Sequence, residues 1–365
     1  MQLDGLRKTL HQVNKIRYRP VLLQKIARGY FRTLVLRKPT LRIVEFSINH
    51  ACQSKCGYCY AAKFRRPGEC MLDVDEIRDI WMQSAKMGAF GSLILGGEPT
   101  LHPNFMDIVA TLEPRKNIVT FATNCITLSE KMIVELKRIG VFVIYVSINS
   151  TDPATNDRVR GYEGHHEHVM RVLDACKRHG IDVMLPITTS KELLPETIKL
   201  LDFAEEHDMT ASIGLLSPTG RQEGQKQELF DQSFWADLRK LYDRNPGLRG
   251  DWDTNLTLKV GCPAGFEKIH ISPYGHVTGC AIQPMSFGNL RDEPLSDVLV
   301  RMREFKHFAK RPKHCIVALD EEFIEDYLDH AIGEASTPYP VEENAYYGAD
   351  CGRAGDCTRS VARTH

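Results

Sequence analysis

The feature that most limits the possible folds is a regular alternation of apolar, strand-like runs and helix-like segments from residue 41 onward. Such alternation predicts a parallel sheet with helices on its faces, because parallel neighbours need crossover connections. The predicted strands begin near residues 41, 91, 117, 141, 181 and 210, and the predicted helices lie near 73–87, 104–112, 129–139, 166–179 and 194–207. Six repeats rather than eight predict an α/β fold, a partial (β/α)6 TIM-like barrel.

Five segments are expected in the 365 residues: a basic amphipathic N-terminal extension (1–40), a barrel core (41–216), a helical connector (217–260), a small cysteine-containing domain (261–330) and a tail (331–365). No run reaches the eighteen or so apolar residues of a membrane span, and no secretory signal is recognisable. A cytoplasmic protein is therefore expected. Because cytosolic thiols stay reduced, its eleven cysteines predict metal ligands or buried thiols rather than disulfides.

Charge is unevenly distributed although the formal net charge is zero. Residues 1–42 carry eleven Lys or Arg and one acid, Asp4. Within them, residues 20–36 predict an amphipathic helix with Leu23, Ile26, Ala27, Tyr30 and Leu34 on one face and Lys25, Arg28 and Arg32 opposite. We favour a helix docked on the main domain, and the alternative is peripheral contact with an anionic membrane. Nucleic-acid binding is not expected, because no basic motif with interleaved aromatics recurs.

Three cysteines, Cys52, Cys56 and Cys59, lie just past the first predicted strand, at the edge where parallel α/β folds build their active sites. A structural zinc ion needs four ligands, so three local thiolates leave one metal position open. His50 could complete a zinc site. Soft thiolates in a tight run also suit an iron–sulfur cluster, and spacing alone leaves both interpretations open.

The Cys-x3-Cys-x2-Cys spacing, with Tyr58 before the last cysteine, resembles the signature of the radical S-adenosylmethionine (SAM) superfamily. The resemblance extends through most of residues 41–330 and implies the partial barrel of that superfamily. It implies that the three cysteines hold a 4Fe–4S cluster whose fourth iron binds SAM. Reductive cleavage of SAM would then give a 5′-deoxyadenosyl radical that takes a hydrogen atom from substrate, with electrons from a flavodoxin- or ferredoxin-type reductant.

Two loops extend the resemblance. "GGEP", with Gly96, Gly97 and Glu98, follows the second predicted strand and is similar to the family loop that contacts the SAM amino group. Asn124 lies in "ATNC", where the family usually shows Thr-Asn-Gly, so that Cys125 replaces a glycine. That cysteine is either buried and inert or a part of the substrate cavity.

Further cofactor-binding candidates follow the fourth predicted strand. Ser147 and Asn149 of "SIN" stand where family members hydrogen-bond the SAM ribose or carboxylate, and Arg160 of "NDRVRG" is a candidate for contact with SAM or substrate. The alternatives are ordinary turn chemistry for the first two and a surface charge for the arginine.

A second cysteine group begins in "CPAGFEKIHISPYGHVTGC", which predicts a hairpin turning at "SPYGH". It resembles the SPASM or twitch extension that binds auxiliary clusters, although Ala318 stands where the closing cysteine would fall. The resemblance implies one auxiliary cluster, expected as 4Fe–4S, on Cys262, Cys280, Cys315 and either Cys351 or Cys357. His314 is a less favoured ligand, and a zinc ribbon is the alternative.

The resemblance implies an enzyme that acts on a small-molecule or lipid-like biosynthetic intermediate, by oxidation or bond formation. A peptide maturase is the alternative, disfavoured by the short N-terminal extension, and a non-catalytic electron carrier is the rival that "GGEP" and "SIN" oppose. No catalytic residue is assigned. Candidate general bases are Glu45, His50 and the "GHHEH" run at 164–168, which is expected to be a solvated loop and helix cap. Cys70 and Cys176 are expected to be structural.

Overall fold

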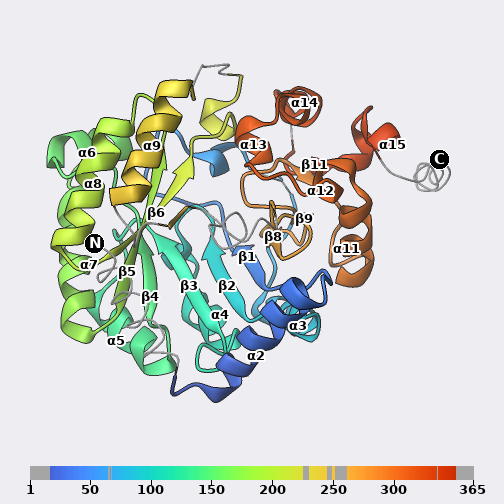
Figure 1. Cartoon of the computed structure of the whole chain (residues 1–365). Helices are drawn as coiled ribbons and strands as arrows, with labels where there is room; N and C mark the ends of the chain where they lie inside the picture. The colour runs from blue at the N-terminus through green and yellow to red at the C-terminus, as the bar shows by residue number, and fades with distance from the viewer. Residues whose placement is uncertain are drawn as a thin grey trace.

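The sheet confirms the expected α/β architecture (Figure 1). The computed structural model describes residues 17–64, 66, 68–224, 230–244, 249–250, 261–334 and 336–350. Its strands are β1 (Ile43–Ser47), β2 (Gly91–Leu95), β3 (Ile118–Thr123), β4 (Val143–Val146), β5 (Asp182–Thr189), β6 (Thr210–Leu215), β7 (Arg249–Gly250), β8 (Lys268–Ile271) and β9 (Val277–Thr278). Their order is β7-β6-β5-β4-β3-β2-β1-β8-β9, so β7 and β8 extend the six predicted strands in parallel register.

Helices cover the outer face of the curved sheet (Figure 1). The predicted ones are α3 (Val74–Lys86), α4 (Phe105–Thr111), α5 (Glu130–Ile139), α7 (His165–His179) and α8 (Leu194–Glu206), and α9 (Gln232–Arg244) lies in the predicted connector. The prediction missed α6 (Pro153–Arg160), which buries only Asn156 and Arg160 and so has no apolar stripe. Its ends carry the signal instead: Asp152 accepts from Thr155 N, and Gly161 takes a left-handed φ of 60°.

The two faces of β1 have different chemistry. Val44 and Phe46 join the hydrophobic core beneath the helices, whereas Glu45 and Ser47 alternate to the opposite face. Strand β1 also pairs with β8, and side chains on this opposite face make polar contacts between the two strands. Lys268 Nζ lies 3.0 Å from Glu45 Oε1, and Ser47 Oγ lies 2.8 Å from His270 Nε2. The inner face of the sheet is therefore polar where the two cysteine-bearing segments meet.

The C-terminal unit is joined to the barrel through β8. The predicted hairpin forms between β8 and β9, and short elements follow it: β10 (Met285–Ser286), α11 (Leu295–Glu304), α12 (Lys306–Ala309), α13 (Ile316–Leu319), α14 (Glu321–Phe323), β11 (Tyr339–Pro340) and α15 (Tyr347–Asp350). Phe305 lies at the centre of its aromatic core, with the Phe287, Phe308 and Tyr327 ring centroids 5.1 to 5.2 Å away.

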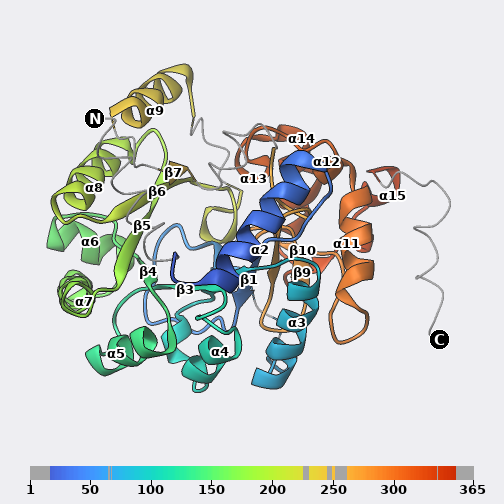
Figure 2. The same ribbon diagram turned by 60° about the horizontal axis from the view of Figure 1, so that its bottom comes forward.

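Helix α2 (Pro20–Tyr30) crosses the end of the sheet at which the strands begin (Figure 2). Arg19 donates to the carbonyl oxygens of Pro114 and Gly140, which precede β3 and β4. Lys25 Nζ donates to Asn117 Oδ1 at 2.7 Å, also before β3. The favoured docked interpretation holds for the helix.

The apolar face predicted for residues 20–36 is only partly buried, with Ile26 and Tyr30 half-buried. Leu22 and Gly29 are buried, whereas Leu23 and Leu34 are 36% and 41% exposed. The reason is a close approach that no apolar pattern reveals: a Cβ on Gly29 would lie 2.9 Å from the Phe90 ring. With the glycine against that ring, Lys25 turns towards the sheet, whereas Leu23 and Leu34 stay exposed.

We expect Leu22→Ala to destabilise the protein far more than Leu23→Ala. Full burial of Leu22 means that truncation leaves a cavity, at a cost of about 2–4 kcal/mol, whereas the exposed neighbour should change the free energy of unfolding by about 0.5 kcal/mol or less. Urea unfolding of the two matched variants measures the difference. Equal losses would contradict this docking of α2.

Candidate active site

The "GGEP" loop after β2 lies against the chain that leads into the first cysteine loop. Gly97 N donates to Asn49 O, and Glu98 N donates to Ala51 O at 2.7 Å. A Cβ on Gly96 would lie 2.4 Å from Asn49 O, and one on Gly97 would lie 2.2 Å from Ala51 O. Only glycine permits this backbone approach, which fixes the entrance to the cysteine loop on the β2 loop.

The carboxylate of Glu98 is fully buried and engages groups of the protein itself. Oε1 accepts from the Thr100 hydroxyl at 2.5 Å and the Thr123 hydroxyl at 2.9 Å, and Oε2 accepts from Asn124 N at 2.6 Å. Burial raises the pKa of this carboxyl group, and the same hydrogen bonds oppose that rise. Glu98 therefore ties the loop after β2 to the end of β3.

Asn124 and Cys125 directly follow β3. Asn124 Nδ2 lies 3.6 Å from Cys52 Sγ and 3.2 Å from Gln53 Oε1, so this amide reaches the first cysteine loop. Cys125 is fully buried in the hydrophobic core at a left-handed φ of 68°. Burial raises the pKa of its thiol well above the usual range, so the first of the two interpretations, a buried and inert cysteine, describes it.

Arg160, at the end of α6, contacts the first cysteine loop. Its Nη1 lies 3.6 Å from Cys56 Sγ, and its carbonyl oxygen accepts from Lys55 N at 2.9 Å. The side chain is 8% exposed, so it is no surface charge. Asn149 joins the same side of the loop, since its Oδ1 accepts from Tyr58 OH at 2.5 Å. Ser147 is half-buried on the preceding turn, where its N donates to Thr123 O.

The first three cysteines fit a multi-iron cluster better than a single ion. Cys56 is buried, Cys59 half-buried and Cys52 exposed, and burial raises the pKa of the Cys52 and Cys59 thiols. N–H donors from Asn124 and Arg160 point at two of the sulfurs, an environment that stabilises cluster thiolates.

Compact single-ion geometry occurs elsewhere. Within the described ranges, the group with ligand atoms gathered within 4.8 Å is His307, Asp320 and Glu322. There Lys306 Nζ already lies 2.5 Å from Glu322 Oε1. The first cysteine group does not have that geometry, which argues against its completion by His50 as a zinc site.

The second cysteine group lies in the C-terminal unit. Cys262, Cys280 and Cys315 are half-buried, and Cys262 N donates to Pro312 O at 2.7 Å. Burial raises the pKa of the Cys280 thiol, with the nearby Lys268 ammonium opposing and Cys315 adding to the rise. Three soft donors in one unit suit an iron–sulfur cluster. Cys351 and Cys357 lie outside the described residues.

A buried ion pair, Glu45 with Lys268, lies beside the second cysteine group. Glu45 and Lys268 are each about 5% exposed, and Glu45 Oε2 accepts from Ala281 N, next to Cys280. Tyr60 follows Cys59 directly, and burial raises the pKa of its hydroxyl, as do the charges of Cys59, Glu45 and Cys280. Tyr60 therefore links Glu45 with both cysteine groups, which the sequence alone did not reveal.

The other candidate bases differ in their surroundings. His50 packs near the rings of Phe64 and Tyr274, with centroids 6.3 and 5.9 Å away. The run at 164–168 was expected as a solvated loop and cap, but His165 begins α7 and is fully buried. Its Nδ1 accepts from Asn156 Nδ2, and burial lowers its pKa to about 3. The histidine is therefore a neutral packing residue that braces α6 against α7.

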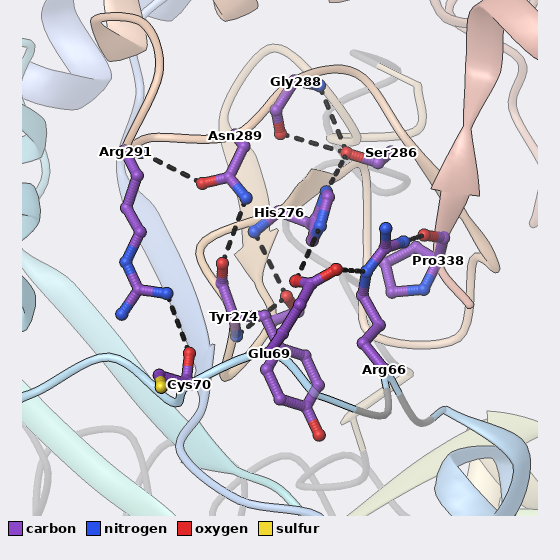
Figure 3. Close-up of polar contacts among 11 residues, drawn as sticks. Arg66, Glu69, Cys70, Tyr274, His276, Ser286, Gly288, Asn289, Arg291 and Pro338 are labelled. Carbon is purple, nitrogen blue, oxygen red and sulfur yellow. Dashed lines mark hydrogen bonds and ion pairs between the residues drawn. The ribbon is translucent and has the colours of Figure 1, made fainter. Parts of the chain in front are cut away.

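The chain beyond the first cysteine loop is fastened to the C-terminal unit (Figure 3). Arg66 pairs with Glu69 and donates to Pro338 O, and Glu69 lies 3.4 Å from His276 Nε2 on the hairpin. Arg291 Nη1 donates to Cys70 O at 2.8 Å. Cys70 is exposed and Cys176 buried, so only the latter has the surroundings of a core thiol.

Each of the two cysteine groups lies in a region of the chain that matches a known protein family. Residues 46–204 match the Radical SAM superfamily, and residues 262–317 match SPASM, an iron–sulfur cluster-binding domain. Among curated relatives, the chain is 22% identical to an AdoMet-dependent heme synthase of Methanosarcina barkeri, over 73% of this chain and 84% of that protein. It is 24% identical to the mycofactocin maturase MftC of Mycobacterium tuberculosis, over 70% of this chain and 60% of that protein.

Solved structures share the fold. Streptococcus suis SuiB bound to S-adenosylmethionine superposes with a TM-score of 0.60 at 18% identity, covering 87% of this chain and 80% of SuiB. Native anSMEcpe with bound AdoMet and a peptide gives a TM-score of 0.56 at 15% identity, covering 75% of this chain and 83% of that one. These likenesses concern the architecture.

We expect Glu98→Gln to destabilise the protein by about 1.5–3 kcal/mol, the contribution of hydrogen bonds to a charged group. The substituted amide would place an NH₂ group against the donors that Glu98 now satisfies, including Asn124 N. Chemical unfolding of the apoprotein measures the loss, with the exposed Glu167→Gln as the matched control. Equal midpoints for the two variants would rule out this role.

Proposed function

We propose that this chain, which is a radical SAM enzyme with a C-terminal SPASM domain, abstracts hydrogen from a small-molecule or lipid-like biosynthetic intermediate and completes an oxidation or bond formation between its two cluster sites. The observation that carries the proposal is the buried Glu45–Lys268 pair beside Cys280, which Tyr60 links to the first cysteine group. Burying an ion pair costs free energy, and such charges are concentrated at functional sites. The buried pair at this position therefore supports a reaction at a polar group of the substrate.

The cofactors of such an enzyme are a 4Fe–4S cluster, SAM and an auxiliary iron–sulfur centre. When bound, they supply the electron and the carbon radical that takes the substrate hydrogen. We assign the first cluster to Cys52, Cys56 and Cys59. We assign the auxiliary centre, as one 4Fe–4S cluster, to Cys262, Cys280 and Cys315, with Cys351 or Cys357 as the fourth ligand.

The remaining cofactor-binding candidates divide into two roles in this proposal. Asn124 and Arg160 donate towards the sulfurs of Cys52 and Cys56, so they orient and stabilise ligands. The SAM pocket is proposed to be lined by Gly96, Gly97, Glu98, Ser147 and Asn149. Glu98 shapes that pocket through the ends of β2 and β3, because its carboxylate is occupied by the protein's own donors.

Glu45 is the best placed of the candidate bases. A net oxidation requires a proton acceptor beside the substrate, and Glu45 Oε2 accepts from Ala281 N, next to Cys280 of the second cysteine group. Lys268 holds the carboxylate in position through its 3.0 Å contact. His165 is excluded from this task by its burial against Asn156.

Maturation of a ribosomally made peptide, by a thioether or carbon–carbon crosslink, is the second candidate. It is supported by the relative named mycofactocin maturase and by the likeness to SuiB bound to its precursor peptide. The relative named AdoMet-dependent heme synthase supports the first candidate, a small-molecule substrate.

We expect the anaerobically reconstituted, dithionite-reduced protein to convert SAM into 5′-deoxyadenosine and methionine. Cys56→Ala should abolish the product, because it removes a buried ligand of the first cluster. Cys70→Ala, at an exposed cysteine outside both groups, should retain it. Chromatographic quantification of 5′-deoxyadenosine measures the result.

Stimulation of this turnover identifies the substrate class. Small-molecule and lipid extracts should increase 5′-deoxyadenosine formation, and peptide fractions should not. The reverse pattern would favour the maturase alternative. A protein that holds its first cluster but forms no product with any fraction would support the electron-carrier alternative.

Peripheral membrane contact through residues 20–36 belongs to the same proposal. No helix among the described residues has both the length and the apolar character needed to cross a bilayer. However, the outward side of this segment exposes Phe31 at 52% and Val35 at 64%, beside the exposed bases Arg28, Arg37 and Lys38. Apolar side chains flanked by basic ones suit an anionic membrane surface.

We expect the protein to bind vesicles containing anionic lipid at low salt, and the double variant Phe31→Ser/Val35→Ser to bind about tenfold more weakly, because less apolar surface is buried. Val300→Ser, at a 54% exposed valine of the C-terminal unit, is the control. Vesicle sedimentation measures binding. Equal sedimentation of the parent protein with and without vesicles would exclude the membrane contact.

A further inference from the structure

A short segment after β6 covers the first cysteine loop from outside. Residues 217–224 read "SPTGRQEG", an ordinary turn composition that the sequence does not connect with any site. In the structure, residues 219–223 lie directly against the loop that carries Cys56 and Cys59. We call residues 219–223 the brace.

Arg221 fixes the backbone on both sides of Cys56. Its Nη1 donates to Lys55 O at 2.5 Å and to Cys56 O at 3.0 Å. These two oxygens belong to the peptide groups that precede and follow the cysteine. One guanidinium therefore restrains both peptide planes that orient the Cys56 side chain.

Three further contacts extend the brace along the loop. Gln222 Nε2 donates to Gly57 O at 2.8 Å, and Arg221 N donates to Cys59 O at 3.1 Å. Lys63 Nζ, just beyond the loop, lies 2.5 Å from Glu223 Oε2. Carbonyl oxygens at four of the five positions from 55 to 59 are thus held by two consecutive residues.

Close backbone contact makes this arrangement specific. Gly220 has a left-handed φ of 63°, and a Cβ on it would lie 2.3 Å from Cys59 O and 2.4 Å from Tyr60 O. Only glycine brings the brace this near to the loop. Arg160 also contacts Cys56, through its Sγ, so two arginines from different elements hold this candidate ligand.

We propose that Arg221 is a positioning residue for the SAM-binding cluster, which slows loss of the cluster by holding the Cys56 backbone and raises its reduction potential with its positive charge. A cation near the cluster favours the more negative, reduced state. Partners that orient metal ligands typically affect metal retention by 10–100-fold. This inference rests on one part of the proposed function, the assignment of Cys52, Cys56 and Cys59 to a cluster.

The test uses the reconstituted full chain and two readouts, the rate of iron loss to a chelator and the midpoint potential. The first cluster is identified by difference. It accounts for the kinetic phase of iron loss and the redox signal that the parent protein shows and the Cys56→Ala variant lacks. Arg221→Gln should lose that iron about tenfold faster and show a more negative midpoint potential. Arg221→Lys keeps the charge on a side chain that is one bond shorter, so its ammonium falls short of the two carbonyl oxygens that Nη1 reaches, and it should lose iron faster at a nearly parental potential.

Two further variants distinguish an effect of the brace on the cluster from a general loss of protein stability. Arg158→Gln, at an exposed arginine of α6, should match the parent in both readouts. Gln222→Ala removes one backbone contact and no charge, so it should speed iron loss without changing the potential.

The outcomes distinguish the two proposals. Arg221→Gln with parental iron loss and parental potential would overturn the role of Arg221. So would a loss of iron that falls equally on both clusters, since that indicates a general loss of structure. A parent protein without Cys56-dependent iron would contradict the ligand assignment of the proposed function and this inference with it. A braced cluster without 5′-deoxyadenosine would contradict only the proposed activity.

Discussion

The close contact between the β2 loop and the segment entering the first cysteine loop is the constraint on which the site depends. Gly96 and Gly97 bring two backbones nearer than any side chain allows, and Glu98 then fixes the same loop to the end of β3. Parallel pairing of β1 with β2 and of β2 with β3 aligns these three strand ends at one edge. The loop with Cys52, Cys56 and Cys59 begins at that edge, so the sheet determines where these cysteines lie.

The surroundings of the cysteines show how a loop without regular structure becomes rigid. Asn124 approaches it from β3, Arg160 from α6 and Arg221 from the turn after β6. Each contact satisfies a polar atom of the loop that would otherwise need water. Because the three donors come from separate crossovers of the barrel, the loop is held only when most of the barrel is folded.

The sequence predicted most of the framework and part of the site. Apolar runs predicted the strands, and cysteine spacing pointed to the two regions that match the Radical SAM and SPASM families. It failed where the determining interaction is not periodic: α6 has caps but no stripe, and the face of α2 is selected by the approach of Gly29 to Phe90. Arg221 lies more than 160 positions from Lys55 and Cys56, so no local pattern could connect it with them. The Glu45–Lys268 pair spans 223 positions and was equally hidden.

The position of α2 has a directional consequence. Its contacts with Pro114, Asn117 and Gly140 place it where the strands begin, whereas the first cysteine loop lies where β1 ends. If its outward side rests on a bilayer, the first cysteine loop lies at the end of the sheet that is away from that bilayer. An apolar substrate would then have to leave the membrane completely before it reached the first cysteine loop. This implies a carrier protein or a water-soluble precursor. Anchoring would concentrate the enzyme at a surface without granting it direct access to the lipid phase.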